Sequence, residues 1–433
     1  MIYKKITQIF ICIPVFIYGL LALLITIGLQ QTRSRKVNRA VAYILPFRMM
    51  ALSLAGINAS FETHSRSANP CFPSTLLQEI SALYLTLYLK LDERILGKKM
   101  RITFRLVLSL LIFMSTLSHA HEVGFRKMEV SSSETNDSFP MVLFYPTSSK
   151  PKLVEMGPFK MNVAIGGNIS AGKFPLVMVS HGSGGSNLSY KDIAVSLAAN
   201  GFMVAIPLHP KNNYMDNSLE GSLANYINRP KHITSALDML LGTPGLNSHV
   251  DSNKVAVLGH SVGGYTALAT AGGIANTGSL ISLCRSKPSL SDPYCGPVRE
   301  GTITQEIINN TKDNRIKALI LMAPVSVLFS AKDSLTEIDI PILLLRAEKD
   351  EELTEPYNCK LIEKNIVDRG KLTSITIANA GHYSFLTLFP ESLKSELGAI
   401  AQDPAGFDRE EFQNTLGLLI IDYLNSTLGQ SRR

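Results

Sequence analysis

Gly259-His-Ser-Val-Gly263 is the stretch that decides the fold of this 433-residue chain. The apolar run Val255–Leu258 precedes it and a small-residue pattern from Gly264 to Ala271 follows, so a buried strand should turn here into a helix. Strand, G-x-S-x-G and helix together are typical of a nucleophile elbow, a turn so sharp that it lifts the serine hydroxyl toward a substrate. Ser261 is therefore predicted to be a catalytic nucleophile.

A serine nucleophile needs a histidine base and an acid that orients the base. Pro341–Leu345 is a short apolar run typical of a buried parallel strand, and Asp350 lies in the loop after it. His382 follows the next strand-like run, Thr373–Ile377. Because ligands bind at the carboxyl ends of parallel strands, we expect Asp350 and His382 to meet Ser261 at one edge of a sheet. Three other carboxylates could orient the histidine instead: Glu348, Glu351 and Glu352.

The strand-like run Pro175–Ser180 leads into a glycine-rich loop, His181–Gly185. Backbone N–H groups of such a loop, together with the N–H after the nucleophile, stabilise the oxyanion of acyl transfer. The loop lacks the Lys-Ser/Thr ending of a P-loop and is not a G-x-G-x-x-G pattern, so nucleotide binding is not expected. No organic cofactor and no metal are expected either.

Residues 139–428 resemble bacterial α/β-hydrolases identified as predicted dienelactone hydrolases, which are similar to platelet-activating-factor acetylhydrolases. The resemblance rests on recurring blocks: Phe144–Pro146, the His181 loop, Leu208–Asn213, Asn228–Pro230 with Ile233–Leu240, Gly259–Ser261 and Ala380–Phe385. True dienelactone hydrolases use a cysteine nucleophile, whereas this chain has a serine, so the family's name does not fix the substrate.

The resemblance implies a role for each site residue. Ser261 is the nucleophile, Asp350 the acid and His382 the base, while Ser183 and Val262 supply the oxyanion N–H groups. It also implies that the pair Arg229–Pro230 opens a helix, and it leaves Arg229 either structural or substrate-facing.

The remaining pattern predicts an α/β domain over residues 121–433, with a doubly wound, mostly parallel sheet. Residues 272–314 interrupt the alternation of strands and helices and are expected to form a small cap over the active site. Cys284 and Cys295 lie in this insertion and could form a disulfide if the domain is exported. The five cysteines include no C-x-x-C pair, which argues against a zinc site.

The pattern of the first 120 residues predicts membrane-spanning and targeting segments. Ile6–Leu29 carries no charge and is long enough to span a bilayer, and residues 1–99 as a whole are hydrophobic. Residues 100–120 combine a basic start, the apolar stretch Leu106–Leu117 and the small-x-small site Ser118-His-Ala120, as a secretory signal peptide does. We therefore expect translation to begin at Met100, with residues 1–99 contributed by a misassigned start or a gene fusion.

We expect the enzyme to lie outside the cytoplasm whether the signal segment is cleaved or retained. With the signal cleaved it is periplasmic or secreted; with residues 1–117 retained it associates with the inner membrane and carries the hydrolase domain on the outer side. Residues 1–120 hold 14 Lys and Arg against 4 Asp and Glu, or +10, and the remainder holds 28 against 31, or −3, which sums to the net +7. The positive charge therefore flanks membrane segments and indicates no nucleic-acid partner.

The sequence thus predicts an exported serine hydrolase that cleaves carboxylic esters, with short-chain acyl or lipid esters as substrates on the resemblance alone. Two alternatives remain open. The same residues serve amide hydrolysis in oligopeptidases, and a hydrolase scaffold tethered to a membrane could instead act as a binding module.

Overall fold

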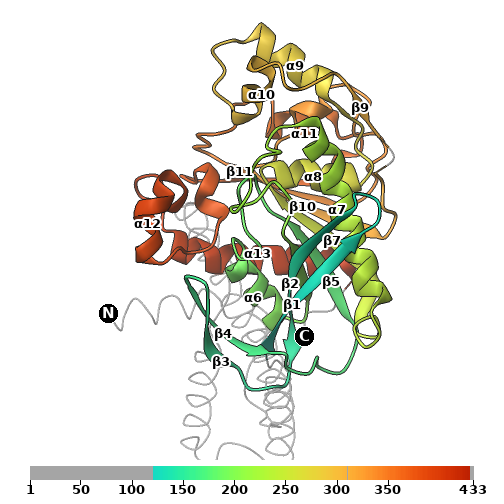
Figure 1. Ribbon diagram of the computed structural model, residues 1–433, viewed down its shortest axis with the longest axis vertical. Coiled ribbons are helices and arrows are strands. Elements are labelled where there is room, and N and C mark those ends of the chain that lie inside the picture. The colour runs from blue at the N-terminus through green and yellow to red at the C-terminus, as the bar shows by residue number, and fades with distance from the viewer. Residues whose placement is uncertain (1–119, 310, 430–433) are drawn as a thin grey trace, which may run out of the picture. The chain divides into compact units, whose positions relative to one another are not determined.

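The computed structural model describes residues 120–309 and 311–429 (Figure 1). The expected membrane spans in residues 1–99 and all but the last residue of the expected signal segment lie outside the described residues. Among the helices that are described, none has the length and apolar character needed to cross a bilayer.

A single large sheet organises the described chain, in the strand order β12-β11-β10-β7-β5-β6-β2-β1-β4-β3. The run from β12 to β6 is parallel throughout, whereas β2 pairs antiparallel with both β6 and β1. The expected mostly parallel sheet is therefore confirmed. Its strands are β1 (Glu122–Ser132), β2 (Asp137–Thr147), β3 (Lys152–Met156), β4 (Phe159–Ile165), β5 (Phe174–Ser180), β6 (Met203–Pro207), β7 (Val250–His260), β10 (Ile316–Met322), β11 (Ile342–Ala347) and β12 (Leu372–Ile377).

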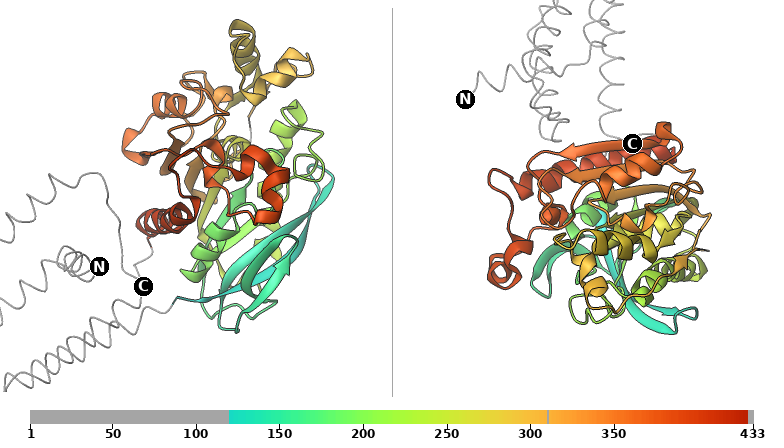
Figure 2. Two further views of the ribbon diagram at one scale, coloured as in Figure 1. Left: turned by 90° about the vertical axis from the view of Figure 1, so that its left-hand side faces the viewer. Right: turned by 90° about the horizontal axis from the view of Figure 1, so that it is seen from above.

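Helices cover both faces of the sheet, which explains why its central strands are apolar without alternation. In β5 every residue is buried: Val177 and Val179 pack in one core with helices α6 and α13, and Leu176 and Met178 pack in the other with α7 and α8. The helices that pack around the sheet are α6 (Lys191–Ala199), α7 (Leu223–Gly242), α8 (Val262–Thr270), α11 (Cys359–Asn365) and α13 (Arg409–Leu428). Figure 2 shows the domain from two further sides.

The expectation that Arg229–Pro230 opens a helix is wrong. Helix α7 begins at Leu223, where the Ser222 side chain accepts a hydrogen bond from the Asn225 N–H, and Pro230 lies inside it. A proline inside a helix leaves the carbonyl four residues earlier without its donor. Here the hydroxyl of Tyr265, on α8, donates to that Tyr226 carbonyl at 2.9 Å. A tertiary contact therefore allows the helix to continue through the proline.

Two excursions interrupt the alternation of strands and helices. The expected insertion at 272–314 contains β8 (Ala275–Asn276), α9 (Thr277–Ser286), the 3₁₀ turn η1 (Pro293–Cys295), α10 (Gly296–Arg299) and β9 (Ile307–Ile308). A disulfide joins Cys284 to Cys295 within it. The second excursion was not anticipated: residues 388–402, here called the α12 segment, hold α12 (Glu391–Leu397) and η5 (Gly398–Ala401) and project from the body of the domain (Figures 1 and 2). Shorter 3₁₀ turns are η2 (Val327–Phe329), η3 (Arg369–Lys371) and η4 (His382–Phe385).

Candidate active site

Ser261 lies on the sharp turn between β7 and α8, with φ 55° and ψ −124°. This is a conformation that side-chain-bearing residues rarely adopt and that is held only by its surroundings. A Cβ atom on Gly259 would lie 2.1 Å from the Gly263 carbonyl oxygen, and one on Gly263 would lie 1.9 Å from the Ser180 carbonyl oxygen. Both glycines of the motif are therefore required by close backbone approach.

His382 begins the 3₁₀ turn η4 after the edge strand β12, and Asp350 lies in the loop after β11. The Nδ1 atom of His382 is 3.0 Å from both carboxylate oxygens of Asp350, and the two side chains are only 3% and 12% exposed. Asp350 Oδ1 also accepts the backbone N–H groups of Glu352 and Leu353, which fixes its orientation. The carboxylate can therefore hold the imidazole with Nε2 free for proton transfer.

The three alternative acids make different contacts. Glu348 accepts the backbone N–H of Asn379, Glu351 accepts the backbone N–H of His382, and Glu352 accepts the hydroxyl of Tyr383 at 2.9 Å. None of these carboxylates is bonded to the imidazole, so the geometry favours Asp350 among the four candidates.

Ser261 and His382 line the same pocket, but their side chains are not hydrogen-bonded to each other. Within the described chain the Ser261 hydroxyl has no hydrogen-bond partner, whereas its backbone is tied down: its N–H donates to the Met322 carbonyl, and its own carbonyl accepts from Val325. Catalytic hydrogen bonds are often long or misaligned in unliganded enzymes and shorten when substrate binds. The serine is thus fixed in place with a hydroxyl free to engage a base.

The three glycine N–H groups of the loop after β5 are already engaged. Gly182 donates to the Tyr190 hydroxyl, Gly184 to the Asn217 side chain, and Gly185 to the Gly182 carbonyl. The N–H of Ser183 makes no hydrogen bond to any described residue, and the same holds for the N–H of Val262 at the start of α8. Two free donors at the pocket are what an oxyanion requires.

Comparison with known proteins gives a match to a family model over part of the chain. A family model named Chlorophyllase matches residues 153–327, which contain the elbow and the loop with Ser183 but end before Asp350 and His382. The chain is a member of the α/β-hydrolase superfamily. The superfamily indicated by the sequence is thereby confirmed, while the narrower resemblance to predicted dienelactone hydrolases stays a prediction.

Among solved structures, this chain is similar to ferulic acid esterase from Streptomyces cinnamoneus. The two chains share 17% sequence identity with a TM-score of 0.49, and the match covers 72% of this chain and 92% of the esterase.

Arg229 is structural: it is fully buried and does not line the pocket. Its guanidinium donates to the side chains of Thr266, Asn212 and Ser180 and to the carbonyl of His181. Burial lowers the pKa of Arg229 to about 9, which leaves the group charged at neutral pH. The sequence blocks around His181, Asn212 and Arg229 therefore converge on one buried network beneath the oxyanion loop.

Three buried histidines extend this network. His209 Nε2 lies 2.9 Å from the Ser180 hydroxyl, its Nδ1 lies 3.3 Å from His232 Nδ1, and its backbone N–H donates to His181. His232 reaches the partly exposed Asp137 at 3.2 Å. Burial, followed by the nearby guanidinium charge, lowers the pKa of His181 to about 3, and burial lowers that of His232 to about 4. The same causes hold the pKa of His209 well below its ordinary value. All three are therefore neutral at pH 7.

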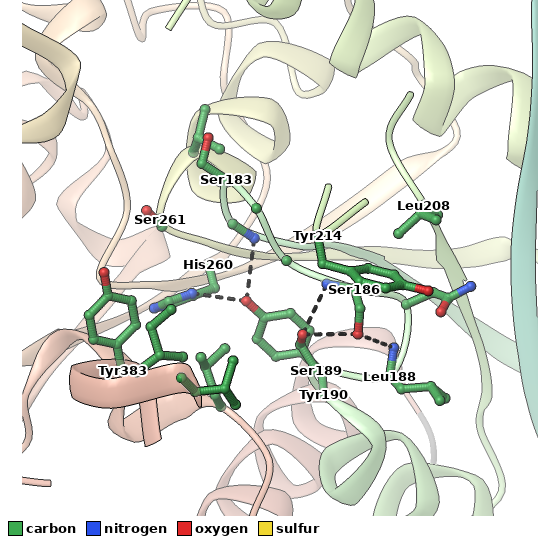
Figure 3. Close-up of a pocket in the computed structure, with 18 of the residues that line it drawn as sticks. Ser183, Ser186, Leu188, Ser189, Tyr190, Leu208, Tyr214, His260, Ser261 and Tyr383 are labelled. Atoms are coloured by element: carbon green, nitrogen blue, oxygen red, sulfur yellow. Dashed lines mark hydrogen bonds between the residues drawn. The ribbon is translucent and has the colours of Figure 1, made fainter. Parts of the chain in front are cut away.

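The pocket at Ser261 has a volume of about 520 Å³ (Figure 3). Of the described part of the expected cap, residues 272–309 and 311–314, only Pro293 and Tyr294 line it. Much of its wall is apolar and comes from β1, β2, the β3–β4 turn, the residues before α6 and after η4, and the α12 segment: Phe125, Met141, Val142, Met156, Pro158, Phe159, Leu188, Leu386, Phe389, Leu393, Leu397 and Ile400. No sequence motif predicts this wall, because its residues come from elements far apart in the chain.

In the described chain, no group of three or more His, Cys, Asp or Glu side chains is placed to hold a metal ion.

The sequence does not predict a role for the side chains of Tyr190 and His260, which lie beside Ser261 in the pocket (Figure 3). His260 occupies the variable position of the G-x-S-x-G pattern, and Tyr190 precedes α6, so neither carries a motif signal.

Proposed function

We propose that the hydrolase cleaves carboxylic esters through Ser261, His382 and Asp350. The observation that carries this proposal is the pairing of a strained elbow serine with an Asp350–His382 hydrogen bond at the same pocket. The match of residues 153–327 to the Chlorophyllase family model supports the serine and the oxyanion loop, and geometry alone supports the other two residues.

In the first half of the reaction, His382 Nε2 takes the proton of the Ser261 hydroxyl as Oγ attacks the ester carbonyl carbon. The carbonyl oxygen becomes an oxyanion, which the N–H groups of Ser183 and Val262 stabilise. Asp350 holds the resulting imidazolium, which then gives its proton to the departing alcohol. A serine ester of the acyl group remains on the enzyme.

In the second half, His382 takes a proton from water, and the hydroxide oxygen attacks the carbonyl carbon of the acyl-enzyme. The same N–H groups stabilise the second oxyanion. Its collapse breaks the bond to Ser261 Oγ, which regains a proton from His382, and the carboxylic acid leaves. Every step uses side chains and backbone groups of this chain.

We also propose that the substrate carries a large apolar group. The pocket volume of about 520 Å³ lies in the range of small-molecule sites, and its wall toward the α12 segment is apolar. Burying an apolar substituent there contributes to binding in proportion to its area. A series of p-nitrophenyl esters from acetate to decanoate would test this, with kcat/KM expected to rise with chain length. A preference for acetate would contradict it.

We further propose that this reaction takes place outside the cytoplasm. The disulfide between Cys284 and Cys295 supports this, because disulfides persist mainly in oxidising compartments. Cell fractionation with thiol trapping and intact-mass analysis would test it. A protein recovered in the cytoplasm with both thiols free would contradict it.

The test of the activity itself is Ser261→Ala in the full chain, with Ser426→Ala as a matched control on the exposed face of α13. Ester turnover should be lost in Ser261→Ala, with unchanged thermal unfolding, and retained in Ser426→Ala. Retention of more than a few per cent of turnover in Ser261→Ala would reject the nucleophile. Amide turnover comparable to ester turnover in the wild type would favour a peptidase instead.

A further inference from the structure

One hydrogen-bonded chain of side chains crosses the floor of the pocket (Figure 3). The N–H of Gly182 donates to the Tyr190 hydroxyl at 3.4 Å, and this hydroxyl lies 2.9 Å from His260 Nδ1. At its other end, His260 Nε2 lies 2.9 Å from the carbonyl oxygen of His382. Tyr190, His260 and His382 are each no more than 3% exposed. The chain therefore links three sequence regions inside the protein.

The two ends fix the direction of every bond in this chain. The His382 carbonyl can only accept, so His260 Nε2 must carry the proton. Burial and the neighbouring imidazole of His382 hold the pKa of His260 well below its ordinary value, so the ring is neutral and its Nδ1 is an acceptor. The Tyr190 hydroxyl then donates to Nδ1 and keeps a lone pair for the Gly182 N–H. Burial raises the pKa of Tyr190, so the phenol keeps the proton that it donates.

The regions joined in this way cannot be coupled directly through the sheet. Gly182 precedes the oxyanion donor Ser183 in the loop after β5, whereas His382 follows β12 at the edge. Three strands, β7, β10 and β11, separate β5 from β12. The ring of His260 also packs on that of His382, with centroids 4.7 Å apart. Side-chain hydrogen bonds thus supply a connection that the main chain lacks.

We infer that Tyr190 and His260 are positioning residues, which hold the oxyanion loop and the base in register on either side of Ser261. This inference rests on the proposed ester hydrolysis. Acyl transfer depends on placement, and a displacement of about 1 Å can cost about 100-fold in rate. Neither side chain exchanges a proton with the substrate. Each acts through a backbone group of the residue that it holds.

The decisive variant is Tyr190→Phe, which removes one oxygen and keeps the ring in the pocket wall. The kcat for p-nitrophenyl butyrate should fall about tenfold, with KM unchanged within about twofold, because substrate contacts remain while placement is lost. His260→Gln keeps a donor for the His382 carbonyl and breaks the link to Tyr190. The double variant should therefore be no more than about threefold slower than the slower single variant.

Tyr265→Phe is the matched control, because it also removes a buried tyrosine hydroxyl, one that bonds the Tyr226 carbonyl and lies outside the pocket. It should lose thermal stability to a similar extent while kcat stays within about twofold of wild type. An equal loss of kcat in Tyr265→Phe, an unchanged kcat in Tyr190→Phe, or multiplicative losses in the double variant would each overturn the positioning role.

The same assay separates this inference from the proposed function. Wild type and Ser261→Ala are measured beside the other variants. An active wild type, an inactive Ser261→Ala and an unaffected Tyr190→Phe would reject the positioning role alone. A wild type without ester turnover, or an active Ser261→Ala, would reject both.

Discussion

Two regions line the pocket and are held in opposite ways. One consists of the loops that carry Ser183, Ser261 and His382, and the other is the α12 segment. The three loops carry the proposed catalytic groups and are here called the catalytic loops. They rest on buried polar side chains, among them Arg229 and His260. No residue of α12 or η5 is buried. Both ends of the α12 segment are anchored by hydrogen bonds: the N–H of Leu388 donates to the Asp192 carboxylate, and the guanidinium of Arg409 donates to the carbonyls of Ile400 and Gln402.

This contrast indicates a division of labour within one pocket. Proton transfer and oxyanion binding tolerate little movement, so the groups that perform them are fixed by hydrogen bonds in the interior. An apolar wall needs only to exclude water and fit a substituent, and it can be built on a weakly packed excursion. Changes to the catalytic loops should therefore affect kcat or folding, and changes to the α12 segment should affect substrate choice.

Among these predictions, acid pH should have the largest effect, and the quantity it lowers is the folding stability of the region around the catalytic loops. Burial keeps the pKa values of His181, His209, His232 and His260 below the ordinary value near 6.5. The unfolded chain takes up these protons near pH 6.5 and the folded chain does not, so stability is complete above pH 6.5 and falls as pH drops toward 4. His181 and His232, with pKa values of about 3 and about 4, each contribute a loss of about 1 kcal/mol per pH unit in that window.

Urea unfolding at pH 7 and pH 5 would measure this loss. His232→Gln should reduce the pH dependence by about the share of one histidine. The same pH dependence in wild type and variant would contradict the assignment of His232 as a neutral buried group.

After Ser261→Ala, Asp350→Asn should cause the largest loss of rate. An amide in place of the carboxylate favours the wrong imidazole tautomer, which in a serine triad costs about 10³- to 10⁴-fold in kcat. Glu348→Gln is the control, since Glu348 bonds only the backbone N–H of Asn379 in the same region and should stay within about threefold of wild type. Steady-state kinetics on p-nitrophenyl butyrate would decide, and equal losses in both variants would remove Asp350 from its role.

Arg229→Met should cost about 3 kcal/mol or more in the free energy of unfolding. The substitution leaves the buried acceptors on His181, Asn212, Ser180 and Thr266 without their donor. Urea denaturation would measure it. A loss below about 1 kcal/mol would show that the network contributes little to holding the oxyanion loop.

Leu397→Ala, in the α12 segment, should have the smallest effect on folding and the clearest effect on substrate choice. We expect KM for the decanoate ester to rise about tenfold with kcat for acetate unchanged, and unfolding free energy to change by less than about 0.5 kcal/mol. Leu418→Ala, at a partly exposed leucine of α13 outside the pocket, is the control. A loss of acetate kcat in Leu397→Ala would place the segment among the catalytic elements.

The sequence predicted what local pattern determines. The elbow glycines are steric necessities, and the strand-like runs before Ser261, Asp350 and His382 are parallel strands whose ends must share one edge. These signals were sufficient for the superfamily and for the placement of Asp350 beside His382.

Other features depend on contacts that no local pattern records. Pro230 should end or open a helix on its own, and it is accommodated inside α7 only because Tyr265 supplies a distant donor. The roles of His260 and Tyr190 depend on a meeting of residues 70 positions apart. The α12 segment lines the pocket although nothing in its own sequence marks it as part of a site.

The most direct test of the account is reaction of the full-length protein with a fluorophosphonate probe, followed by peptide mass analysis. One label per chain should appear, on Ser261, and it should be absent in Ser261→Ala and present in Ser426→Ala. A wild-type protein that stays unlabelled, or a label on another serine, would contradict the claim that this elbow carries an activated nucleophile.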